Sequence, residues 1–275
     1  MFVFSSIKSS AGFPKVTPQT ICTGNFVHYV GLRFHLKGRI FGAGNCCCRV
    51  VNGLFTTVTS CFLLQKINEP TYRKLHSTDG TPPVIRGSVK YHKEGNLLRP
   101  IVTCIGSALY NTSKFLTDIL SPLPLGNGYS VANFLQFSKE LSDIKIDDNE
   151  VLVSFDVVSL FTAIPVDDAC EYIKTKLEKD ATLSSRTNLD IDDIITLLQF
   201  TLPNNYFVFN DIIYKQVHGC AMGSPVSPVV ANLCMEEIEE SAISNSSVPP
   251  KIWKGTLMIA SASLGKTMSQ PSMAH

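Results

Sequence analysis

Acidic side chains are missing from both ends of this chain. No Asp or Glu precedes Glu69 and none follows Glu240, although acidic residues make up about 12 % of an average protein. Residues 1–66 carry seven Lys or Arg, and residues 243–275 carry three Lys. The middle holds all 23 acidic residues with 14 basic ones, so its net charge is −9 while that of the whole chain is +1. The ends and the middle therefore look like sequence from different sources.

Metal-binding cysteine pairs and long apolar runs are also missing. The nine cysteines include no Cys-x-x-Cys pair, which argues against a zinc site and a secreted disulfide framework and favours reduced thiols. The apolar stretch 50–64 has 15 residues, whereas a membrane span needs about 20. The start of the chain lacks the basic-then-apolar order of a secretory signal. Residues 1–66 are then either an acid-poor presequence or, as we favour, a non-domain segment that is disordered or extraneous.

The rest of the composition is that of a folded protein. The chain is 44 % hydrophobic and 17 % charged over 275 residues, which is enough for a sizeable core and excludes a wholly disordered chain. We expect the folded domain to span 67–242. Residues 243–275 are rich in Ser, Met and Pro and are expected to form a disordered tail.

Hydrophobic periodicity within 67–242 predicts alternating helices and short strands. Apolar residues at helical spacing predict helices at 101–123, 130–141, 165–177, 189–202 and 229–241. A β-branched run predicts a buried strand at 151–155, and two short apolar runs around Asn210-Asp211 predict a hairpin.

The predicted strand 151–155 ends at Asp156. A buried carboxylate without a partner is costly, so this one needs a cation, a hydrogen-bond donor or water. The residues alone leave two interpretations open: a catalytic carboxylate, or a residue that caps the following turn.

Two further segments have compositions that suit phosphate binding. Residues 67–100 contain six Lys or Arg against three acids, which is typical either of a phosphate-binding surface or of a solvated loop. The Gly/Ser/Pro loop 218–228 opens the helix predicted at 229–241. Such a helix start is either an anion or nucleotide site or a simple turn.

Three segments, in this order and spacing, resemble one known family. They are LRPIVTCIG at 98–106, VSFDVVSLFTAIP at 153–165 and YKQVHGCAMGSPVSPVVANLCMEEIEE at 214–240. They are similar to the reverse transcriptase of Penelope-like retroelements, which is related to telomerase reverse transcriptase, and the resemblance covers residues 66–254. It implies an α+β fold with the fingers and a partial palm of a right-hand polymerase, an antiparallel sheet packed on helices, without the catalytic hairpin and the thumb.

The resemblance also implies an activity and its partners. The family is an RNA-directed DNA polymerase, a nucleotidyltransferase of retrotransposons, that uses two Mg²⁺ ions, an RNA template and a DNA primer. By this resemblance the protein would act in the nucleus or the cytoplasm and not at a membrane.

Single residues acquire roles from the same resemblance. Asp156 matches the first catalytic aspartate, which ligates the two Mg²⁺ ions. In the family, cations hold the incoming triphosphate, an aromatic ring packs against its sugar, and a loop lies under the template and the nascent base pair. The matching nucleotide-binding set is Lys93, Arg99, Phe161, Gly223 and Ser224. The set expected to contact nucleic acid is Arg86, Lys90, Met222 and Pro225, where Met222 stands at a position that relatives usually fill with Gln.

The second half of that metal site is not encoded. The family has a Tyr-x-Asp-Asp hairpin where this chain has Gly-Thr-Leu-Met-Ile-Ala at 255–260. Back-translated with permitted codons and shifted by one nucleotide, the segment becomes Tyr-Val-Asp-Asp-Ser-Phe-Cys-Ile-Ile, preceded by Arg if the added nucleotide is A or C. The second Asp is not a free choice, because ATG for Met258 followed by AT- for Ile259 always contains GAT. We hypothesise that a one-nucleotide deletion near codon 254 shifts the frame and leaves the chain inactive.

Overall fold

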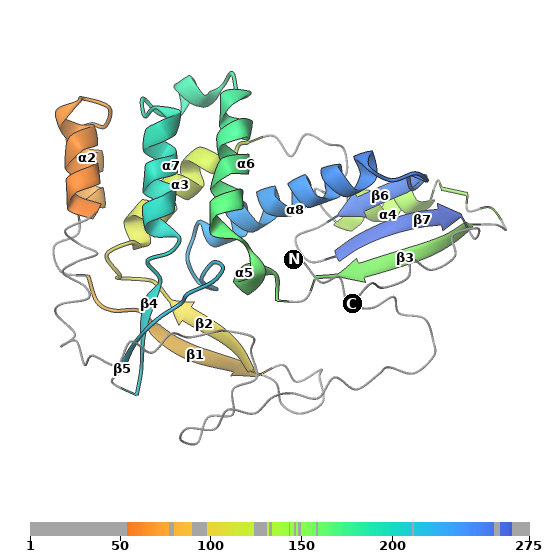
Figure 1. Cartoon of the computed structure of the whole chain (residues 1–275), viewed down its shortest axis with the longest axis horizontal. Coiled ribbons are helices and arrows are strands. Elements are labelled where there is room, and N and C mark those ends of the chain that lie inside the picture. The colour runs from red at the N-terminus through yellow and green to blue at the C-terminus, as the bar shows by residue number, and fades with distance from the viewer. Residues whose placement is uncertain are drawn as a thin grey trace. The chain divides into compact units, whose positions relative to one another are not determined.

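The computed structural model describes residues 54–76, 80–89, 98–123, 131, 134–142, 144–145, 147, 150–157, 159–210, 212–255 and 259–265. It divides into two compact units. The larger unit comprises the described residues of Lys15–Leu123 and Phe161–Ala231, and the smaller unit those of Pro124–Leu160 and Asn232–His275. Both combine helices with strands (Figure 1), so the predicted α+β class is confirmed.

Three helices form the core of the larger unit. They are α3 (Tyr110–Leu120), α6 (Val166–Glu178) and α7 (Ile191–Thr201), and α7 packs on both of the others. Each contributes fully buried aliphatic side chains, among them Leu116, Leu120, Ile173, Leu177, Ile194, Leu197 and Leu198. Because burying such a side chain contributes about 1.5–3 kcal/mol, this cluster is a main source of the unit's stability. The helices predicted at 165–177 and 189–202 are confirmed.

The larger unit begins earlier in the chain than the sequence predicts. A helix at 54–63 precedes α2 (Glu69–Leu75), and its Leu54 and Val58 are each 1 % exposed. Lys66 Nζ donates to the carboxylates of Asp190 and Asp193 at 2.7 and 2.6 Å, where α7 starts with a capping box. The domain boundary expected between 66 and 67 is therefore wrong, because residues 54–66 pack into the core. Residues 1–53 lie outside the described part.

A four-stranded mixed sheet completes the larger unit. Its order is β2 (Leu98–Thr103), β1 (Val84–Val89), β4 (Tyr206–Phe209) and β5 (Ile212–Lys215). The pairs β2–β1 and β4–β5 are antiparallel, whereas β1 and β4 are parallel. The hairpin predicted around Asn210 is confirmed, with that residue at a φ of 49°.

The helix predicted at 101–123 is wrong in its first part. Residues Ile101–Thr103 belong to β2, and α3 starts only at Tyr110, after Gly106 at a φ of 79°. The cause is long-range pairing, because β1 satisfies the backbone of β2 over six residue pairs from Val84↔Thr103 to Val89↔Leu98. An apolar segment of this length is compatible with either structure until its partner is known.

The smaller unit contains a three-stranded antiparallel sheet. Its order is β3 (Glu150–Asp156), β7 (Ile259–Gly265) and β6 (Ile252–Gly255), with β7 in the middle (Figure 1). The unit also holds α4 (Phe134–Ser142) and most of α8 (Ser227–Ser244). The strand predicted to end at Asp156 is confirmed, but it is not buried as predicted, because Val151 is 39 % exposed and Val153 and Phe155 are only half-buried. The helices predicted at 130–141 and 229–241 are confirmed.

The disordered tail predicted from 243 onward is wrong for the described part of that segment. β6 and β7 form an antiparallel hairpin in this segment, where the sequence predicts no structure. The hairpin carries no acidic residue. The middle strand takes its hydrogen bonds from backbone on both sides, and this pairing does not depend on side-chain composition. Residues 266–275 lie outside the description. No helix in the described residues has the length and apolar character to cross a bilayer.

Candidate functional site

Asp156 is placed at one end of the sheet in the smaller unit. The antiparallel register of β3 and β7 runs from Glu150↔Gly265 to Asp156↔Ile259, and Gly255 of β6 pairs with Ala260. Asp156 therefore lies at the end of the sheet at which residues 256–258 connect β6 to β7. The structure describes the backbone of Asp156 but not its side chain.

The residues at this end of the sheet do not suit a pair of Mg²⁺ ions. Mg²⁺ is bound through carboxylates and other oxygen ligands, and two ions held about 4 Å apart need several of them. On the strands at this end of the sheet Asp156 is the only acid, because residues 255–260 are Gly-Thr-Leu-Met-Ile-Ala. The carboxylate of Glu239, which lies beside Gly255, comes from α8 and is buried. Among the side chains that the structure describes, no group of three His, Cys, Asp or Glu could hold a metal ion.

A sharp turn connects the end of β3 to Phe161. Ser159 has a φ of 56°, a left-handed conformation that costs a non-glycine residue about 1–2 kcal/mol. The short helix α5 (Leu160–Ala163) follows at once. In the larger unit the carbonyl of Phe161 accepts a hydrogen bond from the amide of Cys220 at 2.6 Å. The backbone of Phe161 is thus attached to the start of the 219–226 loop.

The 219–226 loop is packed tightly against its neighbours. Gly223 has a φ of 125°, and a Cβ at this position would overlap the carbonyl oxygen of Val102 in β2. The amide of Val102 donates to the carbonyl of Met222 at 2.8 Å. The hydroxyls of Ser224 and Ser113 are buried and lie 3.2 Å apart. Four of the predicted residues, Phe161, Met222, Gly223 and Ser224, therefore belong to one interlocked backbone cluster, which continues through Pro225 into α8.

Gly223 should tolerate no side chain. We expect Gly223→Ala to lower the free energy of unfolding by about 3 kcal/mol, because the substitution adds a strained φ and a backbone clash. Gly87→Ala is the matched control, since a Cβ on Gly87 would meet only the flexible side chain of Leu98 at 3.2 Å. Urea unfolding of both variants followed by circular dichroism measures the difference. Equal, small effects would contradict the tight contact.

The basic residues fall into two groups. Arg86 and Arg99 are exposed on neighbouring strands, and the pairs Arg86↔Ile101 and Ser88↔Arg99 put both on one face of the sheet. Lys90 and Lys93 lie outside the described residues. The structure thus places two of the four predicted cations side by side.

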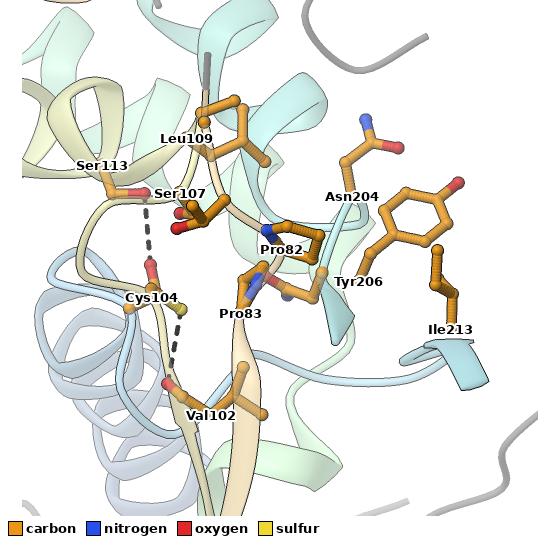
Figure 2. A pocket seen from close by; sticks show the side chains of 15 residues that line it. Pro82, Pro83, Val102, Cys104, Ser107, Leu109, Ser113, Asn204, Tyr206 and Ile213 are labelled. Carbon is orange, nitrogen blue, oxygen red and sulfur yellow. Dashed lines mark hydrogen bonds between the residues drawn. The ribbon is translucent and has the colours of Figure 1, made fainter. Parts of the chain in front are cut away.

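A pocket lies beside the same loop in the larger unit (Figure 2). Its lining is mainly apolar and includes no charged side chain; Pro82, Pro83, Val102, Cys104, Tyr206 and Ser224 are among its residues. Burial raises the pKa of the Cys104 thiol to about 11, so that the thiol stays protonated and unreactive at neutral pH. None of the lining side chains carries a charge that could bind a phosphate.

Two buried carboxylates in the smaller unit were missed by sequence reasoning. Glu236 and Glu239 of α8 are 4 % and 7 % exposed, although the run of glutamates in MEEIEE suggests a solvated helix end. Their spacing of three residues, which places both on one helix face, is the signal that could have found them. Burial, together with the charge of Glu236, raises the pKa of Glu239.

Comparisons with known proteins give a limited result. No protein-family model and no curated protein matches the chain. Among solved structures, telomerase from Candida albicans in complex with a TWJ fragment of telomeric RNA is similar, at a TM-score of 0.49 and 11 % identity over 72 % of this chain and 39 % of that one. Apo telomerase from Candida tropicalis gives 0.49 and 9 % over 80 % and 44 %, and its form truncated from the C-terminal domain gives 0.48 and 11 % over 70 % and 45 %. This chain spans less than half the length of each.

Proposed function

We propose that this chain is the fingers and part of the palm of a Penelope-like retroelement reverse transcriptase, with its catalytic hairpin translated out of frame. It descends from an RNA-directed DNA polymerase, and in the form given it is inactive. The observation that carries the proposal is the strand register. It supports a β6–β7 hairpin at the position where the family keeps its Tyr-x-Asp-Asp motif, beside the strand that ends in Asp156.

The register and the shifted frame agree at the position opposite Asp156. One nucleotide added before codon 255 allows positions 256–259 to read Tyr-Val-Asp-Asp, and the second Asp, which the genetic code fixes, takes position 259. Position 259 is the cross-strand partner of Asp156. Side chains of directly opposed residues have Cβ atoms about 4.5–5.5 Å apart, close enough for two carboxylates to share a divalent cation.

The remaining site residues take family roles in this proposal. Phe161, Gly223 and Ser224 would form the floor of the nucleotide site, and Arg99 with Lys93 would neutralise the triphosphate. Arg86, Lys90, Met222 and Pro225 would contact the template and primer. When bound, two Mg²⁺ ions would supply charge stabilisation for nucleotidyl transfer; the present residues do not suit them.

The DNA sequence across codons 250–260 tests the proposal. We expect the same locus, shifted by one nucleotide from about codon 254, to encode Tyr-Val-Asp-Asp and then continue as an open frame. A shifted frame that is closed by stop codons, or that lacks Tyr at position 256 or Asp at position 258, would end the proposal.

A second candidate function is non-catalytic binding of nucleic acid. The paired exposure of Arg86 and Arg99 on one sheet face favours it, because adjacent cations contact successive phosphates without any metal site. The net charge of −9 in the middle of the chain opposes strong binding.

Removing this cation pair should weaken binding in a salt-dependent way. We expect Arg86→Ala/Arg99→Ala to reduce the slope of log K against log salt by about 2, one for each phosphate contact. Fluorescence anisotropy with a single-stranded RNA at several salt concentrations measures the slope. Arg73→Ala/Lys74→Ala removes two charges from α2 and serves as the control, which should leave the slope unchanged. Equal slopes for all three proteins would exclude the candidate.

A further inference from the structure

The buried carboxylate of Glu239 points at the backbone of Gly255. A Cβ built on Gly255 would lie 2.8 Å from Oε2 of Glu239 and 2.9 Å from its Cδ, with Oε1 closer still. Gly255 itself is buried and its φ is not in the left-handed region, so its backbone accepts any side chain. A side chain at position 255 would therefore lie directly against the carboxylate of Glu239, a residue that is only 7 % exposed.

The surroundings of this carboxylate favour a cationic hydrogen-bond donor. The neighbour Glu236 on α8 adds a second buried negative charge, and in the described part of the chain no Lys or Arg pairs with Glu239. The nearest cation on β6, Lys254, lies 3.0 Å from Glu140 of α4. The indole Nε1 of Trp253 lies near Glu239 but is buried without a well-formed hydrogen bond. A buried carboxylate without a cation costs free energy, and one with a well-placed cation costs much less.

The genetic code leaves three choices for position 255 in the shifted frame. Its codon there is NGG, which encodes Arg when N is A or C, Gly when N is G, and Trp when N is T. We infer that the missing nucleotide is A or C, and that the in-frame protein carries an arginine at position 255 whose guanidinium pairs with the buried Glu239. The inference rests on the proposed function, since it assumes the frame change.

An arginine fits this environment better than the alternatives. Its planar guanidinium carries five donors and binds a carboxylate in a bidentate manner, and Glu236, one helical turn away, lies on the same face of α8. The end of the flexible Glu239 side chain can move to make room. Glycine at position 255 would leave the carboxylate of Glu239 without a cation, and tryptophan would add a large side chain without a positive charge. The pair would fasten the hairpin that carries the two aspartates to α8.

A double-mutant cycle on the full chain tests the pair without any need for activity. Gly255→Arg and the neutral control Gly255→Met, which adds a long side chain without charge, are each combined with Glu239→Gln. We expect Gly255→Arg to have an unfolding constant about tenfold or more smaller than that of Gly255→Met at pH 7, and this advantage to vanish with Glu239→Gln. Equal stabilities, or an advantage that survives Glu239→Gln, would overturn the inference.

The pH dependence provides an independent readout. Glu239 has a raised pKa in the folded chain, so the unfolded state loses its proton first, and stability falls as the pH rises above about 4.5. The neighbouring Glu236 on the same helix and the Lys254–Glu140 pair on β6 and α4 are common to all variants. Arginine at position 255 stabilises the ionised form, so we expect Gly255→Arg to lose less stability between pH 5 and pH 7 than Gly255→Met. The opposite order would contradict the pair.

Sequencing keeps this inference separate from the proposed function. If intact copies of the element encode the shifted frame with Gly or Trp at position 255, the inference fails and the proposed function stands. If both Gly255 variants fail to fold, frame-restored chains with Arg, Gly or Trp at this position replace them. The Arg form must then be the most stable of the three, and any other order overturns the inference.

Discussion

Purified 1–275 should show no primer extension above background with either Mg²⁺ or Mn²⁺. A two-metal polymerase obtains several kcal/mol of its rate acceleration from the ions, and each 1.4 kcal/mol corresponds to about tenfold in rate. Asp156 is the only acid on the strands at this end of the β3–β7–β6 sheet, and the nearby Glu239 of α8 is buried. These residues do not hold two such ions, so we expect a rate at least about 10³-fold below that of a polymerase with the complete set. Incorporation of a labelled nucleotide on an RNA template with a DNA primer measures it.

The control for this prediction is Asp156→Asn. If the chain is inactive because the partners of Asp156 are absent, the substitution changes nothing, and any trace of incorporation is a contaminant. Incorporation that Asp156→Asn abolishes would show that the carboxylate works without the missing motif, and the proposed inactivity would be wrong.

Local patterns were sufficient to predict the elements whose partners lie close in sequence. The hairpin at Asn210 and the helices α6 and α7 follow from periodicity and turn residues. The strand ending at Asp156 also follows from its own apolar run, although its partner β7 lies more than 100 residues away. The strand Ile101–Thr103 does not, because its extended form is determined by pairing with β1. Residues 54–66 were misassigned for a similar reason. Their composition lacks acids, but Leu54 and Val58 are buried. Lys66 pairs with Asp190 and Asp193 at the start of α7, more than 100 residues away.

The β6–β7 hairpin forms through backbone pairing although its side chains do not favour a strand. Ile-Ala-Ser-Ala-Ser-Leu-Gly at 259–265 has little of the β-branched and aromatic character of strands, apart from Ile259. It nevertheless forms the middle strand, since β3 and β6 offer hydrogen bonds on both sides. Composition therefore predicted disorder in a segment whose neighbours, not its own residues, favour a strand.

The residues of the candidate site could likewise be predicted only in part, because some of their partners come from distant segments of the chain. The resemblance to the reverse transcriptase family implied that Phe161 and the loop from Met222 to Ser224 belong to one site, and the structure brings their backbones together in the larger unit. The partners Val102 and Ser113 could not be predicted, because they come from distant segments of the chain. Glu239 was missed because its burial depends on the packing of α8 against β6.

Returning two carboxylates to the hairpin should create a metal site that the present chain lacks. In Met258→Asp/Ile259→Asp, position 259 stays opposite Asp156 in the register of β3 and β7, so three acids meet at one end of the sheet. Carboxylate oxygens are the preferred ligands of Mg²⁺ and Mn²⁺. We expect this variant to bind Mn²⁺ about tenfold or more tightly than the unaltered chain, with the free ion measured by electron paramagnetic resonance.

Two further variants decide whether that binding uses the proposed geometry. Met258→Asn/Ile259→Asn has nearly the same shape without charge and should bind Mn²⁺ no better than the unaltered chain. Adding Asp156→Asn to the two aspartates should remove the gain, because the ion would lose its ligand from β3. Persistent tight binding without Asp156 would mean that the two new acids act alone, and the strand register would then no longer support a shared site. Loss of the gain would instead place Asp156 and position 259 on the same ion, as the out-of-frame origin of the hairpin requires.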